Sequence, residues 1–340
     1  MTQLAVAVSG GVDSLCALLR LREQGHDVLA LHGLFLPDAA SSGLRPAPEG
    51  PCLLTAAEAL ATPLPPASRQ AVEGLQTACG QLGIPLHVAD MRAVFDREVV
   101  TPFVRAYARG RTPNPCVDCN REIKFGALMD WALDHGMDAL ATGHYAQVEQ
   151  DSGSGRWLLK KALHPEKDQS YVLYSLTQEQ LSHTLMPVGA YHKDEIRKIA
   201  EEVGLPVAHK RDSQEICFIP DNDYAGFIDR EVGDAVPGEG NFVTKDGEII
   251  GRHKGITHYT VGQRRGLNIP YGKRIFVTEI RPETNEVVVG SPEDVFTDTL
   301  VADHVNYMGL TDFDGRRLLG KIRYGHAGAM CTVENIGEGR

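Results

Sequence analysis

Residues 4–23, LAVAVSGGVDSLCALLRLRE, decide the fold of the N-terminal part of the chain. The apolar run 4–8 predicts a buried strand, and residues 12–23 have the apolar spacing of a helix. The segment between them, residues 9–14 (SGGVDS), contains two glycines that let the backbone pass close to an anion, and the N–H groups of the helix start point toward it. This context predicts a phosphate-binding loop. The absence of Gly-Lys-Ser/Thr separates it from a Walker A loop.

Three side chains of this loop carry separate expectations. Ser9 and Ser14 add hydroxyl donors for phosphate. Asp13 repels phosphate unless it holds Mg²⁺ or orients the loop. The alternative for the whole segment is a glycine-rich turn that precedes a helix and binds nothing.

The alternation of strand and helix patterns continues to about residue 145. Further strands are expected at 28–32, 84–89 and 139–142, and helices at 70–82 and 122–135. Strands that alternate with helices indicate an α/β, Rossmann-like domain whose parallel sheet is covered on both faces.

Two later parts of the chain differ in composition. Residues 36–68 are rich in Pro, Ala, Ser and Gly, which predicts a surface insertion, partly disordered, rather than a packed element. After residue 219, Gly and Pro become frequent, and short β-type runs indicate small β domains. These runs are 240–243, 275–280, 287–289 and 318–324, with turn signals at 245–247 and 282–285. The expected division is an α/β catalytic domain over 1–222, a small β-rich domain over 223–290 and an incomplete β-barrel over 291–340.

Composition restricts the class of protein. The 340 residues are 42% hydrophobic and 23% charged, and no apolar run approaches the ~18 residues of a membrane-spanning helix. The start of the chain lacks the basic and long apolar regions of a secretory signal, so a cytoplasmic protein without a membrane partner is expected. The net charge of −11 disfavours a nucleic-acid partner, but grouped basic residues leave room for a local positive groove.

Six further segments accompany the phosphate loop along the chain. They are 112–125 (TPNPCVDCNREIKF), 142–145 (TGHY), 167–171 (KDQSY), 212–219 (DSQEICFI), 251–253 (GRH) and 259–267 (YTVGQRRGL). In this order and spacing, the chain from residue 4 to about residue 324, apart from the 36–68 insertion, resembles the tRNA-specific 2-thiouridylases. These enzymes are the MnmA family of the N-type ATP pyrophosphatases.

The resemblance implies a fold and an activity. The catalytic domain is expected to be a PP-loop domain, similar to the adenine nucleotide alpha hydrolases. The implied reaction is ATP-dependent adenylation of the C2 carbonyl oxygen of a wobble uridine, followed by sulfur insertion and release of AMP and pyrophosphate. ATP and Mg²⁺ are the implied cofactors. The implied partners are the anticodon stem-loop of tRNA and a sulfur donor such as a cysteine desulfurase or a sulfur-relay protein.

The resemblance also implies two sets of binding residues. Those for ATP are Ala7, Val8, Ser9, Gly10, Gly11, Val12, Asp13, Ser14, Gly33 and Gly143. Those for tRNA are Asn114, Pro115, Cys116, His144, Lys167, Asp168, Gln169, Arg323 and Tyr324. His144 has the alternative of a satisfied polar group that closes the end of a strand. The 259–267 segment either faces tRNA or sets a turn of the β domain.

Seven scattered cysteines, an odd number, do not suggest a disulfide scaffold. Cys16 and Cys79 lie on the apolar stripes of expected helices and are interpreted as packing residues. By resemblance, Cys119 is the nucleophile, and Cys217 carries the persulfide and forms a transient disulfide with Cys119. Cys116 stands where most family members have aspartate.

The Cys116 departure leaves two alternatives open. Cys116, Cys119 and Cys217 together can ligate a four-iron four-sulfur cluster, which leaves one iron position open. Alternatively, the persulfide chemistry operates and Cys116 is a spare thiol. A Zn²⁺ site lacks a fourth ligand at suitable spacing. A different adenylating enzyme, or an RNA-binding or redox module without activity, leaves the three cysteines or the intact loop unexplained.

Overall fold

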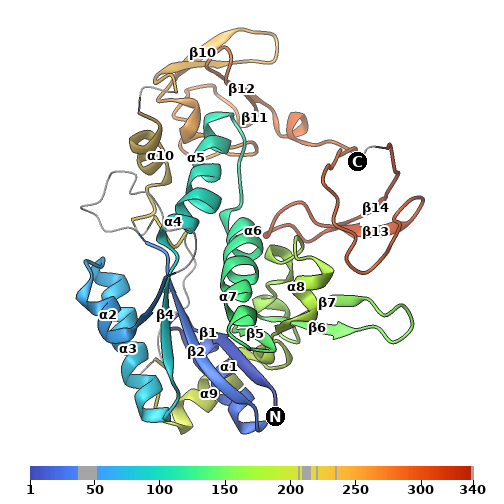
Figure 1. Ribbon diagram of the computed structural model, residues 1–340. Coiled ribbons are helices and arrows are strands. Elements are labelled where there is room, and N and C mark those ends of the chain that lie inside the picture. The colour runs from blue at the N-terminus through green and yellow to red at the C-terminus, as the bar shows by residue number, and fades with distance from the viewer. Residues whose placement is uncertain (37–51, 206, 209–215, 220, 234–235, 338–340) are drawn as a thin grey trace. The chain divides into compact units, whose positions relative to one another are not determined.

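The computed structural model describes residues 1–36, 52–205, 207–208, 216–219, 221–233 and 236–337 (Figure 1). Two compact units make up the chain. Unit 1 comprises Met1–Glu98, Cys116–Ser213 and Asp303–Arg340, and unit 2 comprises Val99–Pro115 and Gln214–Ala302. The phosphate loop belongs to unit 1.

Unit 1 is built on a six-stranded sheet whose order is β3-β4-β2-β1-β5-β8. The strands are β1 (Gln3–Ala7), β2 (Asp27–Leu34), β3 (Cys52–Thr55), β4 (Leu86–Asp90), β5 (Ala139–Thr142) and β8 (Thr184–Leu185). All neighbours pair in parallel except β3, which runs antiparallel to β4 at the edge. The expected parallel sheet is confirmed, with β1 at its centre.

Helices cover both faces of this sheet. α1 (Val12–Glu23), α3 (Pro66–Leu82) and α9 (Lys193–Glu202) share one hydrophobic core with β1, β2 and β5. Side chains alternate across a strand, so His87 of β4 points to the opposite face. There its ring lies 6.3 Å from that of Trp131 in α7 (Leu128–Asp134).

The two cysteines interpreted as packing residues are buried in that shared core. Cys16 of α1 is 0% exposed and Cys79 of α3 is 1% exposed. Burial raises the pKa of Cys16 to about 12 and that of Cys79 to about 11. Both thiols are therefore protonated at neutral pH and serve as small apolar groups.

The prediction that residues 36–68 lack packed elements is wrong for residues 52–68. β3 extends the sheet, and α2 (Ala56–Ala61) begins with a capping box between Thr55 and Glu58. Ala56 and Ala59 are buried against Val72 and Val88. Alanine and proline give little apolar signal, yet small side chains let the helix approach the sheet closely. The predicted disorder over 37–51 lies outside the described residues.

The single helix expected at 122–135 is instead a composite that begins earlier. α6 (Pro115–Asp118) leads into a π-helical segment, η2 (Cys119–Ala127), which is followed by α7. Gly126 has non-helical backbone angles, and a Cβ at this position would lie 2.9 Å from the Arg121 carbonyl oxygen, so glycine fits here without a clash. Single-turn π segments inside helices are frequent at functional sites.

Unit 2 contains a four-stranded sheet of order β10-β9-β12-β11. Its elements are α5 (Thr101–Ala108), α10 (Tyr224–Val232), β9 (Gly240–Val243), β10 (Ile249–His253), η7 (Ile256–His258), β11 (Phe276–Arg281), β12 (Glu286–Gly290) and η8 (Pro292–Val295). Three of the four strands match the expected β runs, whereas β10 was not predicted. Asn285 takes the left-handed φ of 53° that the expected turn between β11 and β12 requires.

The remaining elements of unit 1 are short. They are α4 (Arg92–Phe95), β6 (Ala146–Gln150), β7 (Trp157–Lys161), η3 (Pro165–Lys167), η4 (Ser170–Val172), α8 (Gln178–Ser182), η5 (Pro187–Ala190), β13 (Arg317–Gly320) and β14 (Ala329–Thr332). A further π segment, η1 (Asp96–Val100), spans the boundary between the units. The strand expected at 318–324 ends at Gly320, where it pairs with β14. In the described ranges, no helix is both long and apolar enough to cross a membrane.

Candidate active site

The phosphate loop lies at the carboxyl edge of the parallel sheet, between β1 and α1. β2 pairs with one side of β1 and β5 with the other, so the strand order reverses at this point. In open α/β sheets, such a switch point forms the crevice in which ligands bind. Gly10 has a φ of 75°, and no side chain among the described residues caps α1. The N–H groups of its first turn can therefore serve an anion.

The Ser14 side chain holds the loop in shape. Its hydroxyl donates to the Gly11 carbonyl oxygen at 3.1 Å and accepts from the Ser9 amide at 3.1 Å. Ser14 is 5% exposed, whereas Ser9 is exposed. The Ser14 hydroxyl therefore makes its hydrogen bonds within the loop, whereas Ser9 is exposed and its hydroxyl is the more accessible one.

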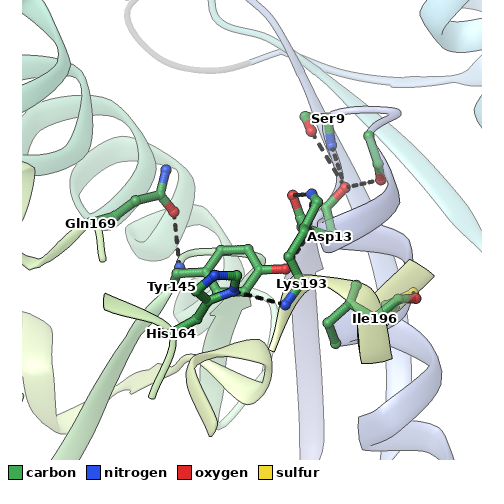
Figure 2. A network of polar contacts seen from close by, with 10 residues as sticks. Ser9, Asp13, Tyr145, His164, Gln169, Lys193 and Ile196 are labelled. Atoms are coloured by element: carbon green, nitrogen blue, oxygen red, sulfur yellow. Dashed lines mark hydrogen bonds and ion pairs between the residues drawn. The ribbon is translucent and has the colours of Figure 1, made fainter. Parts of the chain in front are cut away.

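Asp13 is bound by two side chains from distant parts of unit 1 (Figure 2). The Lys193 Nζ lies 2.8 Å from Asp13 Oδ1 and 2.7 Å from Oδ2. The Tyr145 hydroxyl donates to Asp13 Oδ1 at 2.8 Å, and the Lys193 ammonium lies 5.7 Å from the centre of the Tyr145 ring. Of the two roles open to Asp13, orienting the loop is the one that these contacts support.

Lys193 is a site residue that the sequence analysis missed. It opens α9, its side chain is 3% exposed, and its amide donates to His164 Nδ1 at 3.0 Å. A cation in the first turn of a helix opposes the helix dipole, whose positive end lies there. That unfavourable position was the one sequence signal that Lys193 has a buried anionic partner.

Gly143 brings the end of β5 against the start of α1. A Cβ at Gly143 would lie 2.6 Å from the Ser14 amide nitrogen and 2.7 Å from the Asp13 carbonyl carbon. Only glycine permits this approach between two backbones. Gly33, at the end of β2, lies under the ring of Phe35, which a Cβ would meet at 2.6 Å. The ATP contacts assigned to Gly33 and Gly143 stay predictions.

His144, the next residue, joins the loop region to the cysteine segment. Its Nδ1 lies 2.8 Å from the Thr142 hydroxyl, and its Nε2 lies 3.4 Å from Lys124 Nζ. Lys124 also donates to Asn120 Oδ1 at 3.0 Å. Burial, with a smaller contribution from the Lys124 charge, holds the pKa of His144 well below its usual value. His144 is therefore a neutral, hydrogen-bonded group, and its tRNA contact stays a prediction.

Cys116 and Cys119 occupy different environments on the same composite helix. Cys116 is exposed, whereas Cys119, at the start of η2, is 8% exposed. Burial raises the pKa of the Cys119 thiol, and the positive charge of Lys124 opposes that rise. Burial also raises the pKa of the neighbouring Asp118 carboxyl.

Cys217 belongs to unit 2, where its thiol is exposed. The next residue, Phe218, anchors this segment. Its ring lies 5.3 Å from that of Phe103 in α5 and 5.6 Å from that of Phe227 in α10. The chain therefore fixes the backbone beside Cys217 while presenting the thiol to solvent. Residues 212–215 of the same motif lie outside the described residues.

The residues assigned to tRNA fall into structural and exposed groups. Asp168 accepts from the Ala162 amide and the Ser170 hydroxyl, and Gln169 Oε1 accepts from the Tyr145 amide at 2.9 Å. Asn114, Cys116, Arg323 and Tyr324 are exposed, Lys167 is half-buried, and Pro115 is buried. Their tRNA contacts remain predictions.

The arrangement of possible metal ligands can be examined in the described residues. No group of three or more His, Cys, Asp or Glu in the parts of the chain that the structure describes is arranged to hold a metal ion. Cys116 and Cys119 lie in unit 1, and Cys217 lies in unit 2.

A parallel sheet with a glycine-rich loop at its switch point defines unit 1 as a nucleotide-binding α/β domain. Residues 2–221 match the family model described as "tRNA methyl transferase HUP domain", and residues 225–291 match "tRNA methyl transferase PRC-barrel domain". A tRNA-specific 2-thiouridylase MnmA of Lachnoclostridium phytofermentans is 45% identical over 339 residues, which cover 99% of this chain and 90% of that protein. The MnmA of Clostridioides difficile is 42% identical over 99% of this chain and 88% of its own length. The chain belongs to the MnmA family of tRNA-specific 2-thiouridylases.

A solved structure described as a 4-thiouridine synthetase–RNA complex with bound ATP is more distant. It is 15% identical, covers 64% of this chain and 45% of its own, and has a TM-score of 0.33. At that score it adds nothing to the family assignment.

Proposed function

We propose that this chain is a tRNA-uridine 2-sulfurtransferase that adenylates the C2 carbonyl oxygen of the wobble uridine and replaces that oxygen with sulfur. Membership of the MnmA family supports the enzyme class and tRNA as its substrate. The order of the chemical steps and the roles of single residues are proposed from the chemistry of the site.

One observation carries the proposal. The dipeptide Gly143-His144 contacts the phosphate loop with its first residue and the cysteine helix with its second. Gly143 packs on the backbone of Asp13 and Ser14, and His144 contacts Lys124, five residues after Cys119. A nucleotide loop and a thiol on adjoining segments are what adenylation followed by sulfur transfer requires.

In the first step, the loop binds the phosphates of ATP through the N–H groups of α1. The uridine oxygen attacks the α-phosphorus, and pyrophosphate leaves. The Lys193 ammonium and the Tyr145 hydroxyl bind the Asp13 carboxylate, which reduces its repulsion of the phosphates. Because both Asp13 oxygens already have these partners, Asp13 does not fit the role of a Mg²⁺ ligand in this arrangement. Mg²⁺ fits better as an ion carried by the ATP phosphates themselves.

In the second step, the terminal sulfur of a Cys217 persulfide attacks C2 of the adenylated uridine, and AMP leaves with the oxygen. The Cys119 thiolate then attacks the Cys217 Sγ, which forms a Cys119–Cys217 disulfide and releases the thiolated base. A thiol reductant restores both cysteines with two electrons. A sulfur donor, such as a cysteine desulfurase or a relay protein, reloads Cys217. The exposure of Cys217 supports this reloading.

In the persulfide route, Cys116 takes no part in the chemistry and is a spare thiol. The alternative of a four-iron four-sulfur cluster would need thiolates from Cys116 and Cys119 of unit 1 and from Cys217 of unit 2. No step of the proposed sequence uses a cluster.

Exposed aromatic and basic side chains support tRNA contacts near Tyr324. The rings of Tyr171 and Tyr324 lie 6.4 Å apart, and the Lys321 ammonium lies 5.6 Å and 5.4 Å from their respective centres. Tyr174, 6.5 Å from Tyr171, is 56% exposed. Aromatic faces beside a cation bind unpaired bases and phosphates of RNA.

The test uses three single variants of the full chain. Cys119→Ser and Cys217→Ser should each abolish 2-thiouridine in tRNA, measured by mass spectrometry of nucleosides. Both should retain tRNA-dependent release of pyrophosphate from ATP, because adenylation precedes sulfur transfer. Cys331→Ser removes an exposed thiol of β14 and is the matched control, which should thiolate normally. Normal thiolation by either active-site variant would overturn the assignment.

The same preparation tests the cluster alternative. Anaerobic reconstitution with iron and sulfide should leave the wild-type chain without retained iron or visible absorbance. Cys116→Asp should keep thiolation activity under these conditions. If the wild-type chain retains iron, and Cys116→Asp loses both the iron and the thiolation activity, the cluster route is correct and the persulfide route is wrong.

A further inference from the structure

Unit 2 contains a cationic hollow that plays no part in the chemistry above. Its volume is about 680 Å³, and it lies between residues 264 and 275, in the connection that precedes β11. Its cationic side chains are Arg264, Lys273 and Arg274, and its apolar wall includes Leu267, Ile269 and Ile275. This volume falls within the range of about 300–1,000 Å³ that is usual for small-molecule sites.

The connection that forms the hollow is fixed to the core of unit 2. The Gly262 amide donates to the Val277 carbonyl at 2.8 Å, and the Val277 amide donates to the Gln263 carbonyl at 2.9 Å. Leu267 is 6% exposed and Ile275 is 7% exposed, both within the hydrophobic core. The backbone is therefore held from below, while the basic side chains stand on the exposed rim.

Left-handed positions shape this segment. Gly266 has a φ of 79°, Asn268 of 52° and Gly272 of 73°. The Asn268 side chain is exposed at the hollow, where its amide offers both a donor and an acceptor. The hollow thus combines positive charge, an apolar wall and one neutral hydrogen-bonding group.

The two arginines of the rim are not paired with carboxylates. Within the described ranges, Arg264 and Arg274 form no ion pair with Asp or Glu, whereas the Lys273 charge acts on the Glu293 and Asp294 carboxyls. Other basic residues of unit 2 do form such pairs. Arg252 pairs with Glu239 at 3.5 Å, and Arg281 pairs with Glu279 at 2.9 Å. In a chain of net charge −11, two unpaired arginines beside a hollow indicate a site for an external anion.

We propose that this cationic hollow binds the phosphodiester backbone of the tRNA substrate, with one nucleotide base against the apolar wall. The inference rests on the proposed function, because that function supplies RNA as the partner. Phosphates meet Arg264, Lys273 and Arg274, while the base packs on the half-buried Ile269. The contact is electrostatic and independent of base identity, so it strengthens tRNA binding without taking part in sulfur transfer.

The composition of the hollow favours RNA over an acidic protein segment. A phosphodiester chain carries its charges at a regular spacing with a flat base beside each one, so charge and apolar surface are needed together. An acidic peptide needs only the positive side chains of the hollow and makes no use of its apolar wall. An acidic surface of the sulfur donor is therefore the competing occupant.

The experiment compares two double variants with equal loss of charge. Arg264→Gln/Arg274→Gln removes the two unpaired rim cations, and Arg252→Gln/Arg281→Gln removes paired cations elsewhere in unit 2. The rim variant should bind full-length tRNA about tenfold more weakly, and its slope of log affinity against log salt should be lower by about 2. KM for tRNA should rise while kcat at saturating tRNA stays unchanged. The control variant should match the wild type in all of these measurements.

Several outcomes would overturn the inference. If the rim variant binds tRNA with unchanged affinity, the hollow is not a tRNA site. If the control variant loses as much affinity as the rim variant, the loss reflects the net charge of the protein and not the hollow. Unchanged tRNA affinity with slower sulfur loading from the donor protein assigns the hollow to that donor. Loss of the proposed function is distinguishable, because the wild-type chain would then bind tRNA with the expected salt slope and form no 2-thiouridine.

Discussion

Replacing Lys193 with methionine isolates the contribution of the ion pair beneath the phosphate loop. Methionine keeps the length and much of the apolar stem of lysine and removes the ammonium. Within the described residues, the change leaves the Asp13 carboxylate with the Tyr145 hydroxyl as its side-chain hydrogen-bond donor. The loop should then lose both stability and its orientation toward the nucleotide.

The magnitude follows from the burial of the two partners. Breaking a fully buried ion pair by removing one partner costs about 3–5 kcal/mol. Lys193 is 3% exposed, but the Asp13 side chain is 27% exposed, so water can hydrate the carboxylate that is left behind. We therefore expect unit 1 to lose about 2–3 kcal/mol of unfolding free energy, below the fully buried value.

Tryptophan fluorescence during urea unfolding is a suitable assay. Both tryptophans, Trp131 and Trp157, lie in unit 1, so the signal reports the unit that contains the ion pair. A double-mutant cycle with Asp13→Asn should give a coupling energy of about 1–3 kcal/mol, since removing the carboxylate also removes the penalty of leaving it unpaired. ATP affinity of Lys193→Met should fall at least about tenfold, which corresponds to 1.4 kcal/mol.

A small effect would refute this reasoning. If Lys193→Met costs less than about 0.5 kcal/mol, the range of an ordinary surface substitution, and the coupling energy is near zero, the ion pair does not hold the loop. Lys198→Met is the control, because Lys198 lies on the same helix and is 76% exposed. That substitution should leave both the unfolding free energy and ATP affinity unchanged.

Two further predictions concern the loop and the Cys119 thiol. Gly143→Ala should push the Ser14 backbone, cost about 1–3 kcal/mol of unfolding free energy and weaken ATP binding. Gly74→Ala is the control and should cost nothing, because among the described residues the new Cβ would meet no atom within 4 Å apart from its own helix backbone and chain neighbours. Equal effects of the two substitutions in calorimetry would refute the close contact at Gly143. Because burial raises the pKa of Cys119, its alkylation by iodoacetamide should reach half its maximal rate above the pH of about 8.5 typical of free cysteine. Lys124→Met should raise the pH of this midpoint further. Alkylation can be followed by peptide mass spectrometry, and an unchanged midpoint in Lys124→Met would exclude Lys124 as the cation that stabilises the Cys119 thiolate.

Local pattern was sufficient for much of unit 1. The strand before the loop, the helix over 12–23 and the strand over 139–142 depend on residues a few positions apart, and each lies where its apolar spacing predicts. The elements over 52–66 were missed for a physical reason. Their packing rests on small alanines and on one added edge strand, and neither leaves a strong periodic signal.

The partners of the loop could not be predicted in the same way. Lys193 lies 180 positions from Asp13 along the chain, and Tyr145 lies 132 positions away. Their convergence depends on how α9 and the end of β5 pack around α1, which no local pattern encodes. The sequence shows an acidic side chain in a phosphate loop without showing its partners. The fold shows that these partners are the Lys193 ammonium and the Tyr145 hydroxyl.

The cysteines show how charge distinguishes chemical groups that look alike in sequence. Cys16 and Cys119 are both buried, and burial raises the pKa of each thiol. The Asp13 carboxylate raises the pKa of Cys16 and the Lys193 ammonium lowers it, whereas Lys124 lowers the pKa of Cys119 and the Asp118 carboxyl raises it. The largest contribution from a charged group therefore comes from an anion at Cys16 and from a cation at Cys119. Two buried cysteines are thus not equivalent, because a cation favours the thiolate form and an anion disfavours it.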